Sequence, residues 1–181
     1  MRGRGLVALA AATAALGMLT ACSPAAVDPG IPADSSGPLS LEQAGSLVEE
    51  PLAHLAEHLS AEVPGSAAFA GTATPTTGLV EGACTFTSTL YRSEQDVDGE
   101  GWRALAEEIR PQMEAWGMDT SAVADPSRPA GSALRGANSH NGAELLVTAW
   151  NGDTADAPDG PTLGLEMTVT VPLAETECTD G

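Results

Sequence analysis

Two stretches of the chain repeat apolar residues with the spacing of an amphipathic helix. The apolar stripe of the first stretch consists of Leu41, Ala44, Val48, Leu52, Leu55 and Leu59. That of the second consists of Trp102, Leu105, Ile109, Met113 and Trp116. Ser40, followed three residues later by Gln43, predicts the start of the first helix through a capping box, and Gly117 predicts the end of the second. Pro51 and Pro111 predict a kink in each helix, or two abutting helices in the first stretch.

Other stretches alternate apolar and polar residues with the period of two that a strand requires. The alternation is clearest over residues 79–91, 143–150 and 162–173, and residues 132–138 form a shorter candidate strand. His140-Asn141-Gly142 contains the Asn-Gly pair that two-residue hairpin turns favour. Residues 64–78 are rich in Pro, Gly, Ala and Thr, and residues 118–131 contain Pro126 and Pro129; both segments are expected to be loops.

The order of these elements is a helix, a strand, a second helix and a three-strand meander, which predicts an α+β fold. We expect an antiparallel sheet of about four strands with both amphipathic helices packed on one face. Trp102, Trp116 and Trp150 are expected to anchor the core rather than to form a ligand platform, since the chain has few other aromatic residues.

The N-terminus has the layout of an export signal. Arg2 and Arg4 precede an apolar stretch over residues 6–19, which is too short for a membrane span of about 20 residues. The stretch ends in Leu19-Thr20-Ala21-Cys22, the pattern of a bacterial lipobox. We therefore predict a lipoprotein signal peptide over residues 1–21 and a diacylglyceryl group, carrying chains such as palmitate, on Cys22. The alternative is ordinary cleavage with an incidental cysteine.

The remaining chain divides into a stalk and one domain. Residues 22–39 are rich in Pro, Gly, Ser and Asp and are expected to be a lipidated, flexible stalk. Residues 40–181 form a single α+β domain. Lipidation of Cys22 leaves two cysteines, and in an oxidising compartment such a pair usually joins. We predict a disulfide between Cys84 and Cys178 that clamps the domain, because the chain has no C-x-x-C motif to suggest metal binding or redox work.

The net charge of the chain excludes some classes of binding partner. All 25 acids lie after the signal, together with five arginines and no lysine, so the mature chain has a net charge of −20. Such a surface repels nucleic acid and anionic lipid head groups, which leaves the acyl chains on Cys22 as the membrane contact. The charge could attract Ca²⁺ or a basic partner. The alternative is the general composition of high-GC bacteria.

One short motif has the spacing of a zinc site. His54, Glu57 and His58 spell H-x-x-E-H, in which two histidines on one helix face hold Zn²⁺ and the glutamate acts as a base. The families that carry this motif are much larger, and no third ligand stands out. The competing interpretation is a row of polar side chains beside the apolar stripe of a surface helix.

A second motif has the spacing of a calcium loop. Counting from Asp96, acids stand at positions 1, 3 and 5 (Asp96, Asp98, Glu100), Gly at 6 and Glu107 at 12, as in an EF-hand loop. The apolar stripe of the following helix already begins at Trp102, too early for a loop that still wraps an ion. The alternative is therefore an acidic loop that caps this helix.

The lipobox, the strand around Cys84-Thr85-Phe86, the helix 102–117, the hairpin strands and the terminal Cys178 resemble small lipoproteins of actinobacteria, of the LppA-like group. This resemblance implies a lipid-anchored location on the extracytoplasmic face of the cell membrane and no established activity.

Our leading hypothesis is a binding or interaction module for an unknown protein or small-molecule ligand. It predicts a concave apolar surface between helices and sheet, or an exposed patch. No catalytic set stands out, and we favour a protein that is not an enzyme. A metal-assisted hydrolase using His54, Glu57 and His58 and a calcium-stabilised structural domain are the alternatives.

Overall fold

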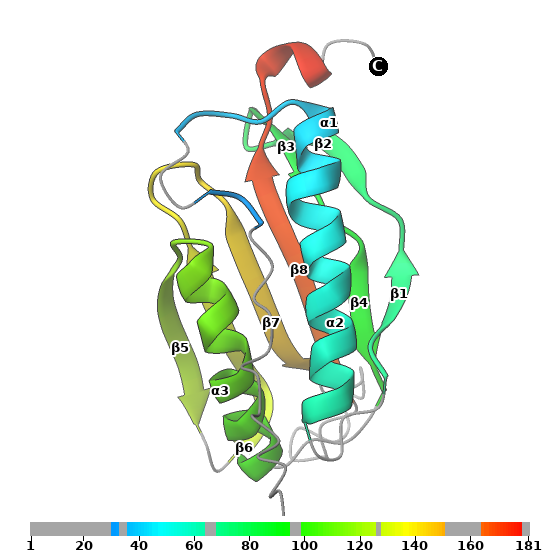
Figure 1. Cartoon of the computed structure of the whole chain (residues 1–181), viewed down its shortest axis with the longest axis vertical. Helices are drawn as coiled ribbons and strands as arrows, with labels where there is room; N and C mark the ends of the chain where they lie inside the picture. Colours follow the sequence, from blue (N-terminus) through cyan, green and yellow to red (C-terminus); the bar gives the residue numbers. More distant parts are fainter. Residues whose placement is uncertain are drawn as a thin grey trace, which may run out of the picture.

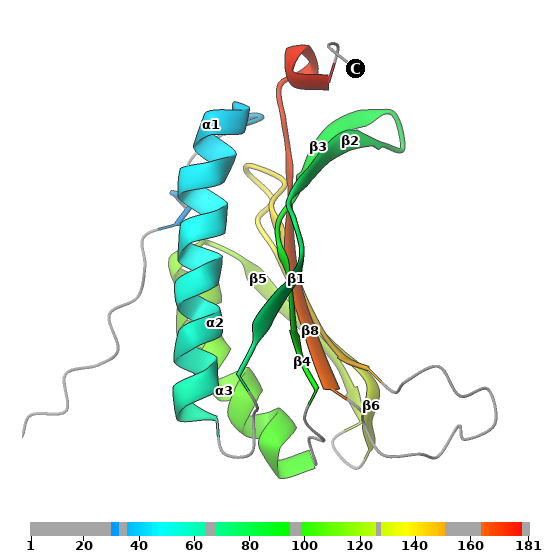
Figure 2. The same ribbon diagram turned by 90° about the vertical axis from the view of Figure 1, so that its right-hand side faces the viewer.

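The computed structural model describes residues 30–32, 36–63, 68–94, 99–125, 128–150 and 164–178, with the side chains of 121–132 and 150 left out. Cys22 and the predicted signal peptide lie outside the described residues. Helices and sheet form two layers, with both long helices on one face of the sheet (Figures 1 and 2). This arrangement confirms the α+β class and the placement of the helices.

The first helical stretch is one continuous rod. It consists of α1 (Leu41–Ala44), the π-helical turn η1 (Gly45–Glu49) and α2 (Glu50–Glu62), and it runs without a break in Figure 2. The capping box is confirmed, because Ser40 Oγ accepts from the Gln43 amide at 3.2 Å and Gln43 Oε1 accepts from the Ser40 amide at 2.9 Å. Pro51 lies in the first turn of α2, and the wider π-helical turn just before it accommodates a residue that has no N–H to donate.

The second helix, α3 (Gly99–Ala115), ends as predicted. Gly117 has φ +64°, a left-handed conformation that favours glycine. Its amide donates to the Glu114 carbonyl, and the Met118 amide donates to the Met113 carbonyl. Trp102 and Trp116 are each 3% exposed, so both are core residues; the side chain of Trp150 lies outside the description.

The sheet has eight strands rather than about four. They are β1 (Ala70–Ala73), β2 (Thr76–Val80), β3 (Ala83–Thr87), β4 (Leu90–Ser93), β5 (Asp119–Asp125), β6 (Arg128–Ala137), β7 (Glu144–Trp150) and β8 (Gly164–Pro172). All neighbours are antiparallel in the order β1-β4-β8-β7-β6-β5, and β3 pairs with both β2 and β8.

Two expected loops are strands. Residues 64–78 include β1 and the start of β2, and residues 118–131 include β5 and the start of β6. Every residue of β1 and β2 is exposed, so these edge strands bury no alternating face and leave no period-two signal. The expected single strand 79–91 is also divided, since Glu81 (φ +52°) and Gly82 (φ +87°) form a tight turn between β2 and β3.

The core lies between the helices and the middle of the sheet. Alternate residues of β8 face the helices and are at most 2% exposed; they are Leu165, Met167, Val169 and Val171. The turn between β6 and β7 spans residues 138–143 and is longer than the predicted two-residue turn. Asn138 explains the difference, because its Oδ1 accepts from the amides of His140 and Asn141 while its side-chain nitrogen donates to the Trp116 carbonyl.

The predicted disulfide is confirmed. Cys84 on β3 and Cys178 on the short 3-10 helix η2 (Glu175–Cys178) are joined with an S–S distance of 2.03 Å. The Leu173 amide also donates to the Cys84 carbonyl at 2.8 Å. The C-terminal end of β8 is therefore fastened to the β2–β3 hairpin.

The described part of the expected stalk packs on the domain. Ile31 is 4% exposed and Leu39 7% exposed, and Leu39 forms a parallel bridge to Leu173. The Cα of Gly30 lies so close to the Trp116 ring that a Cβ there would be 2.0 Å from Nε1. These residues pack because the apolar side chains of Ile31 and Leu39 become buried with the core of the domain. Within the described residues, no helix has both the length and the apolar content to cross a membrane.

Candidate functional site

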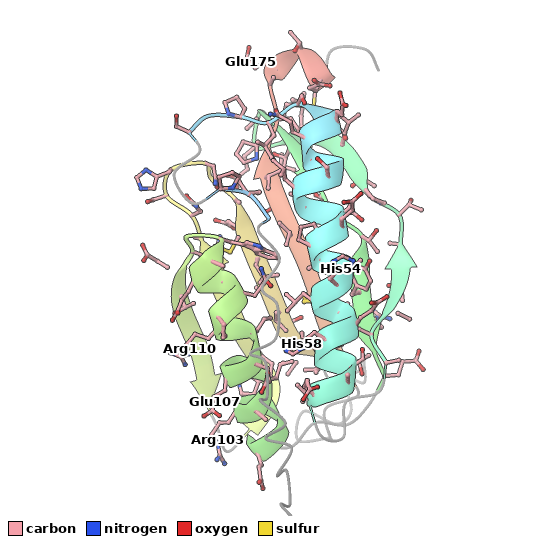
Figure 3. The ribbon with its side chains drawn as sticks, in the orientation of Figure 1. His54, His58, Arg103, Glu107, Arg110 and Glu175 are labelled. Carbon is pink, nitrogen blue, oxygen red and sulfur yellow. A yellow bond between two sulfur atoms is a disulfide. The ribbon has the colours of Figure 1, made fainter. Side chains whose placement is uncertain are left out.

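The two histidines of the H-x-x-E-H motif lie on α2. His58 Nε2 is 3.2 Å from the Glu108 carboxylate of α3, so this side chain bridges the two helices. Figure 3 shows His58 on the side of α2 toward α3. His54 and Glu57 are exposed. Among the described residues, no group of three His, Cys, Asp or Glu side chains is arranged to hold a metal ion.

The candidate calcium residues are divided between described and undescribed segments. Asp96 and Asp98 lie outside the described residues. Glu100 is in the first turn of α3, and Glu107 is exposed two turns further along the same helix. Because the helix begins at Gly99, Glu100 and Glu107 belong to α3 rather than to a loop that continues to position 12.

The face of the sheet opposite the helices carries two ion pairs. Arg135 Nη2 lies 2.5 Å from Glu144, and Arg92 Nε donates to Glu166 at 2.9 Å. A shallow hollow of about 280 Å³ on this face is lined by Arg135, Glu144, Leu146, Thr168 and Thr170. Because its arginine and its glutamate pair with each other, this hollow presents little net charge to a ligand.

A second hollow lies between α3 and the β5–β6 side of the sheet. It has a volume of about 260 Å³ and is lined by Ala106, Arg110, Met113, Thr120 and Leu134. We call it the α3 groove. This is a concave, largely apolar surface between helix and sheet, one of the two features that the binding hypothesis predicts.

The other predicted feature is an exposed apolar patch. The β2–β3 hairpin carries two exposed apolar residues, which are consecutive in β2 and therefore point to opposite faces of the strand. Leu79 is 69% exposed and Val80 55% exposed, the highest values among the exposed large apolar side chains that the structure describes. Figure 2 shows the hairpin curving away from the helix layer beyond the end of the sheet. Residues 63–80 contain no charged side chain, although the chain as a whole has a net charge of −18.

The outer edge of β2 is unpaired among the described residues, since β2 pairs with β3 alone. In an antiparallel pair, consecutive residues alternate between bonding inward and pointing outward. The two-residue turn makes Val80 and Ala83 a hydrogen-bonded pair. The amide and carbonyl groups of Thr77 and Leu79 therefore point away from β3, where another strand could bond to them.

The disulfide holds the turn end of the hairpin. Leu79 lies directly opposite Cys84 in the β2–β3 register, and Cys84 is bonded to Cys178 of η2. η2 packs on both strands. It places Glu175 at the same end of the molecule, as Figure 3 shows. The exposed apolar residues are thus carried on a fixed support with carboxylates nearby.

A separate polar cluster fixes the break between β3 and β4. The Glu49 carboxylate accepts from the Thr89 amide at 2.7 Å and from the Thr89 hydroxyl at 2.8 Å. Burial raises the pKa of the nearby Tyr91 phenol, and the carboxylates of Glu49 and Glu57 raise this pKa further. The cluster joins the helical rod to the sheet, and we assign it a structural role.

Sequence reasoning missed the hairpin edge and the α3 groove. The absence of charge over residues 63–80 was the one available signal for the edge, and the Ala and Thr content suggested a loop instead. The groove had no sequence signal, because its lining residues come from separate elements.

Comparisons with known proteins identified no relative of this chain. No protein-family model, no curated protein and no solved structure matches the chain.

Proposed function

We propose that this protein is a lipid-anchored module on the extracytoplasmic face of the membrane that binds a partner protein through the edge of its β2–β3 hairpin. The observation that carries the proposal is the uncharged strand β2, whose outer edge has no partner among the described residues and which carries the exposed Leu79 and Val80. The lipobox at Cys22 supports the location. No observation favours catalysis over binding.

Strand addition is the binding mode that fits this edge. An extended segment of a partner can bond to the outward-facing backbone groups of Thr77 and Leu79, which supplies affinity without a deep pocket. Proteins usually protect such an edge with charged side chains, most often lysine. Here protection of that kind is absent from β2, and the nearest charge is Glu81 in the turn. An unprotected edge is expected where pairing is the function.

The charge around the hairpin indicates the partner's chemistry. Glu81, Glu175 and Glu177 lie in the turn and in the helix that packs on the hairpin. A second copy of this chain would bring the same carboxylates toward one another. A partner segment with apolar residues facing Leu79 and Val80 and basic residues at its ends would instead find complementary charge.

The disulfide holds the β2–β3 hairpin in place, and this increases the affinity with which the edge of β2 can bind a partner. A hairpin that is already held in its bound conformation loses less conformational freedom when a partner docks. The tether acts in the same direction by keeping the domain near the membrane. Seven residues separate Cys22 from Gly30, which is packed on Trp116, and the eight Cα–Cα steps between them can span at most about 29 Å.

Site-specific photocrosslinking in the cells that make the protein tests the proposal. A photoreactive amino acid is placed at Thr77 or Leu79, and at Leu41, an exposed leucine on α1 (44% exposed), as a matched control. We expect one adduct of constant mass from Thr77 and Leu79 and none from Leu41. Val80→Asp should remove the Thr77 adduct. Adducts of equal yield at all three positions, or an adduct with twice the chain's mass, would overturn the proposed partner binding.

Anchoring is tested separately with Cys22→Ser. This variant should leave the membrane fraction and lose incorporation of labelled fatty acid, whereas Cys84→Ser/Cys178→Ser should keep both. A Cys22→Ser protein that stays in the membrane fraction would contradict the lipid anchor without bearing on the hairpin.

A further inference from the structure

Gly78 leaves an open space in the middle of β2. A Cβ built on this residue would have no atom within 4 Å apart from its own chain neighbours, and all five residues of β2 are exposed. Thr76 and Val80 lie two positions away on either side, so their side chains point to the same face as the missing one. Val80 is 55% exposed. We call this accessible space between Thr76 and Val80 the Gly78 notch.

The notch lies on the face of the hairpin opposite the helices. Residues directly opposite each other in an antiparallel pair share a face, and Gly78 lies opposite Thr85 of β3. Cys84 and Phe86, on either side of Thr85, are core residues that are 3% and 4% exposed. Thr85 and Gly78 therefore face away from the core. Both long helices lie on the other side of the sheet (Figure 2).

The hydrogen bonds of the hairpin decide which partner residue meets the notch. The Cys84 carbonyl bonds on the side of β8, so the next residue, Thr85, bonds to Gly78 of β2. Thr77 and Leu79, on either side of Gly78, direct their backbone groups outward. An antiparallel strand added at this edge would thus face Gly78 in a pair without hydrogen bonds. Such pairs bring the two Cα atoms to about 4.5 Å, against about 5.5 Å in hydrogen-bonded pairs.

We propose that the partner segment places an aromatic side chain in the Gly78 notch. This inference rests on the proposed binding at the β2 edge and names the residue type by which that edge recognises its partner. At the close pair the partner's side chain lies over the glycine, where no side chain of β2 opposes it. An aromatic ring covers the exposed glycine backbone and reaches the side chains of Thr76 and Val80. A small side chain would leave the notch open to water.

The ends of β2 limit the rest of the partner segment. Pro75 precedes the strand and has no amide hydrogen to donate to an added strand. Glu81 follows it in the turn and favours a basic residue at that end of the partner segment. The added strand therefore pairs with Thr76–Val80 only, and its aromatic residue stands at the centre of the paired stretch.

Selection of phage-displayed heptapeptides on the mature, disulfide-bonded protein tests the proposal. We expect the enriched peptides to carry Trp, Tyr or Phe at one fixed, central position. Gly78→Val fills the notch and should weaken a synthetic copy of the best peptide about tenfold, as for loss of one aromatic contact. Ala70→Val, on the exposed strand β1, is the matched control and should leave the affinity unchanged. Neither variant should lower the melting temperature.

Thr77→Pro separates a failure of the notch from a failure of edge binding. It removes an outward-facing amide and leaves the hydrogen bonds to β3 in place, so it should abolish binding of the peptides while the circular dichroism spectrum is kept. Peptides that Thr77→Pro abolishes but that show no aromatic preference, or that bind Gly78→Val as well as wild type, would overturn the notch and leave edge binding intact. Peptides insensitive to Thr77→Pro, or no enrichment at all, would overturn both.

Discussion

Gly136 on β6 lies against the Met113 side chain of α3, and Gly136→Ala tests how tightly that contact is packed. A Cβ at this position would lie 2.3 Å from Met113 Cε, and 3.1 and 3.2 Å from Met118 Sδ and Cβ. Carbon atoms in contact normally lie about 3.5–4.0 Å apart, so the Met113 methyl must move by more than 1 Å, a roughly estimated shift. The two Met118 atoms would also lie closer to the added methyl than this normal contact distance.

The expected cost follows from two opposing terms. Overpacking a filled core costs about 1–3 kcal/mol, and replacing a strand glycine by alanine recovers about 0.5–1 kcal/mol of chain entropy. We therefore expect Gly136→Ala to lower the free energy of unfolding by about 1–2 kcal/mol. Gly78→Ala is the matched control, since Gly78 is also a strand glycine but has no atom within 4 Å of the added methyl; it should not destabilise.

A double-mutant cycle in urea, with the disulfide intact, isolates the contact. Met113→Ala removes the atom that clashes, so in this background Gly136→Ala should cost nothing or stabilise slightly. The coupling between the two substitutions should be about 1–2 kcal/mol, whereas independent sites add within about 0.5 kcal/mol. Additive effects would refute the proposed close packing of Met113 on Gly136.

Three further predictions concern the disulfide, the single tyrosine and the N-terminal segment. Replacing Cys84 and Cys178 together by alanine should lower the free energy of unfolding by up to about 4.7 kcal/mol, since the bond closes a loop with a sequence separation of 94; a loss below about 1 kcal/mol in urea would contradict this loop-closure account. Glu57→Gln should lower the pKa of Tyr91 toward 10.0, and an unchanged phenolate absorbance titration would dismiss that carboxylate as a cause. Because folding raises this pKa, its contribution to stability is present below pH 10 and decreases as the pH rises further. Gly30→Ala should release residues 30–32 from the domain, because the added methyl would collide with the Trp116 ring, and these residues should become the first site of limited proteolysis. If the variant resisted the protease as well as the wild-type protein does, the segment would have stayed in place.

The helices and the inner strands could be predicted because they each bury one face. The stripe from Leu41 to Leu59 and the alternation along β7 and β8 place apolar residues at the period of the element, and that period is visible in a single chain. The capping box at Ser40 and the stop at Gly117 were predictable for a similar reason. Both depend on hydrogen bonds between residues a few positions apart.

The edge strands and the end of the stalk could not be predicted in this way. β1 and β2 bury neither face, so their sequence resembles a loop, and pairing with β4 and β3 makes them strands. Ile31 lies in a Pro- and Gly-rich segment and packs on the domain because elements that follow it in the chain offer it an apolar surface. The local sequence contains no record of that surface.

The sequence by itself determined the α+β class, the start of the first helix, the end of the second and the pairing of Cys84 with Cys178, since each depends on local periodicity, on capping or on counting cysteines. The tertiary structure alone decided where chemistry can occur. It brought Arg110, Met113 and Leu134 to one groove and left Leu79 beside an unpaired edge. Such sites depend on contacts between residues far apart in the chain, whose positions are set by the packing of whole elements.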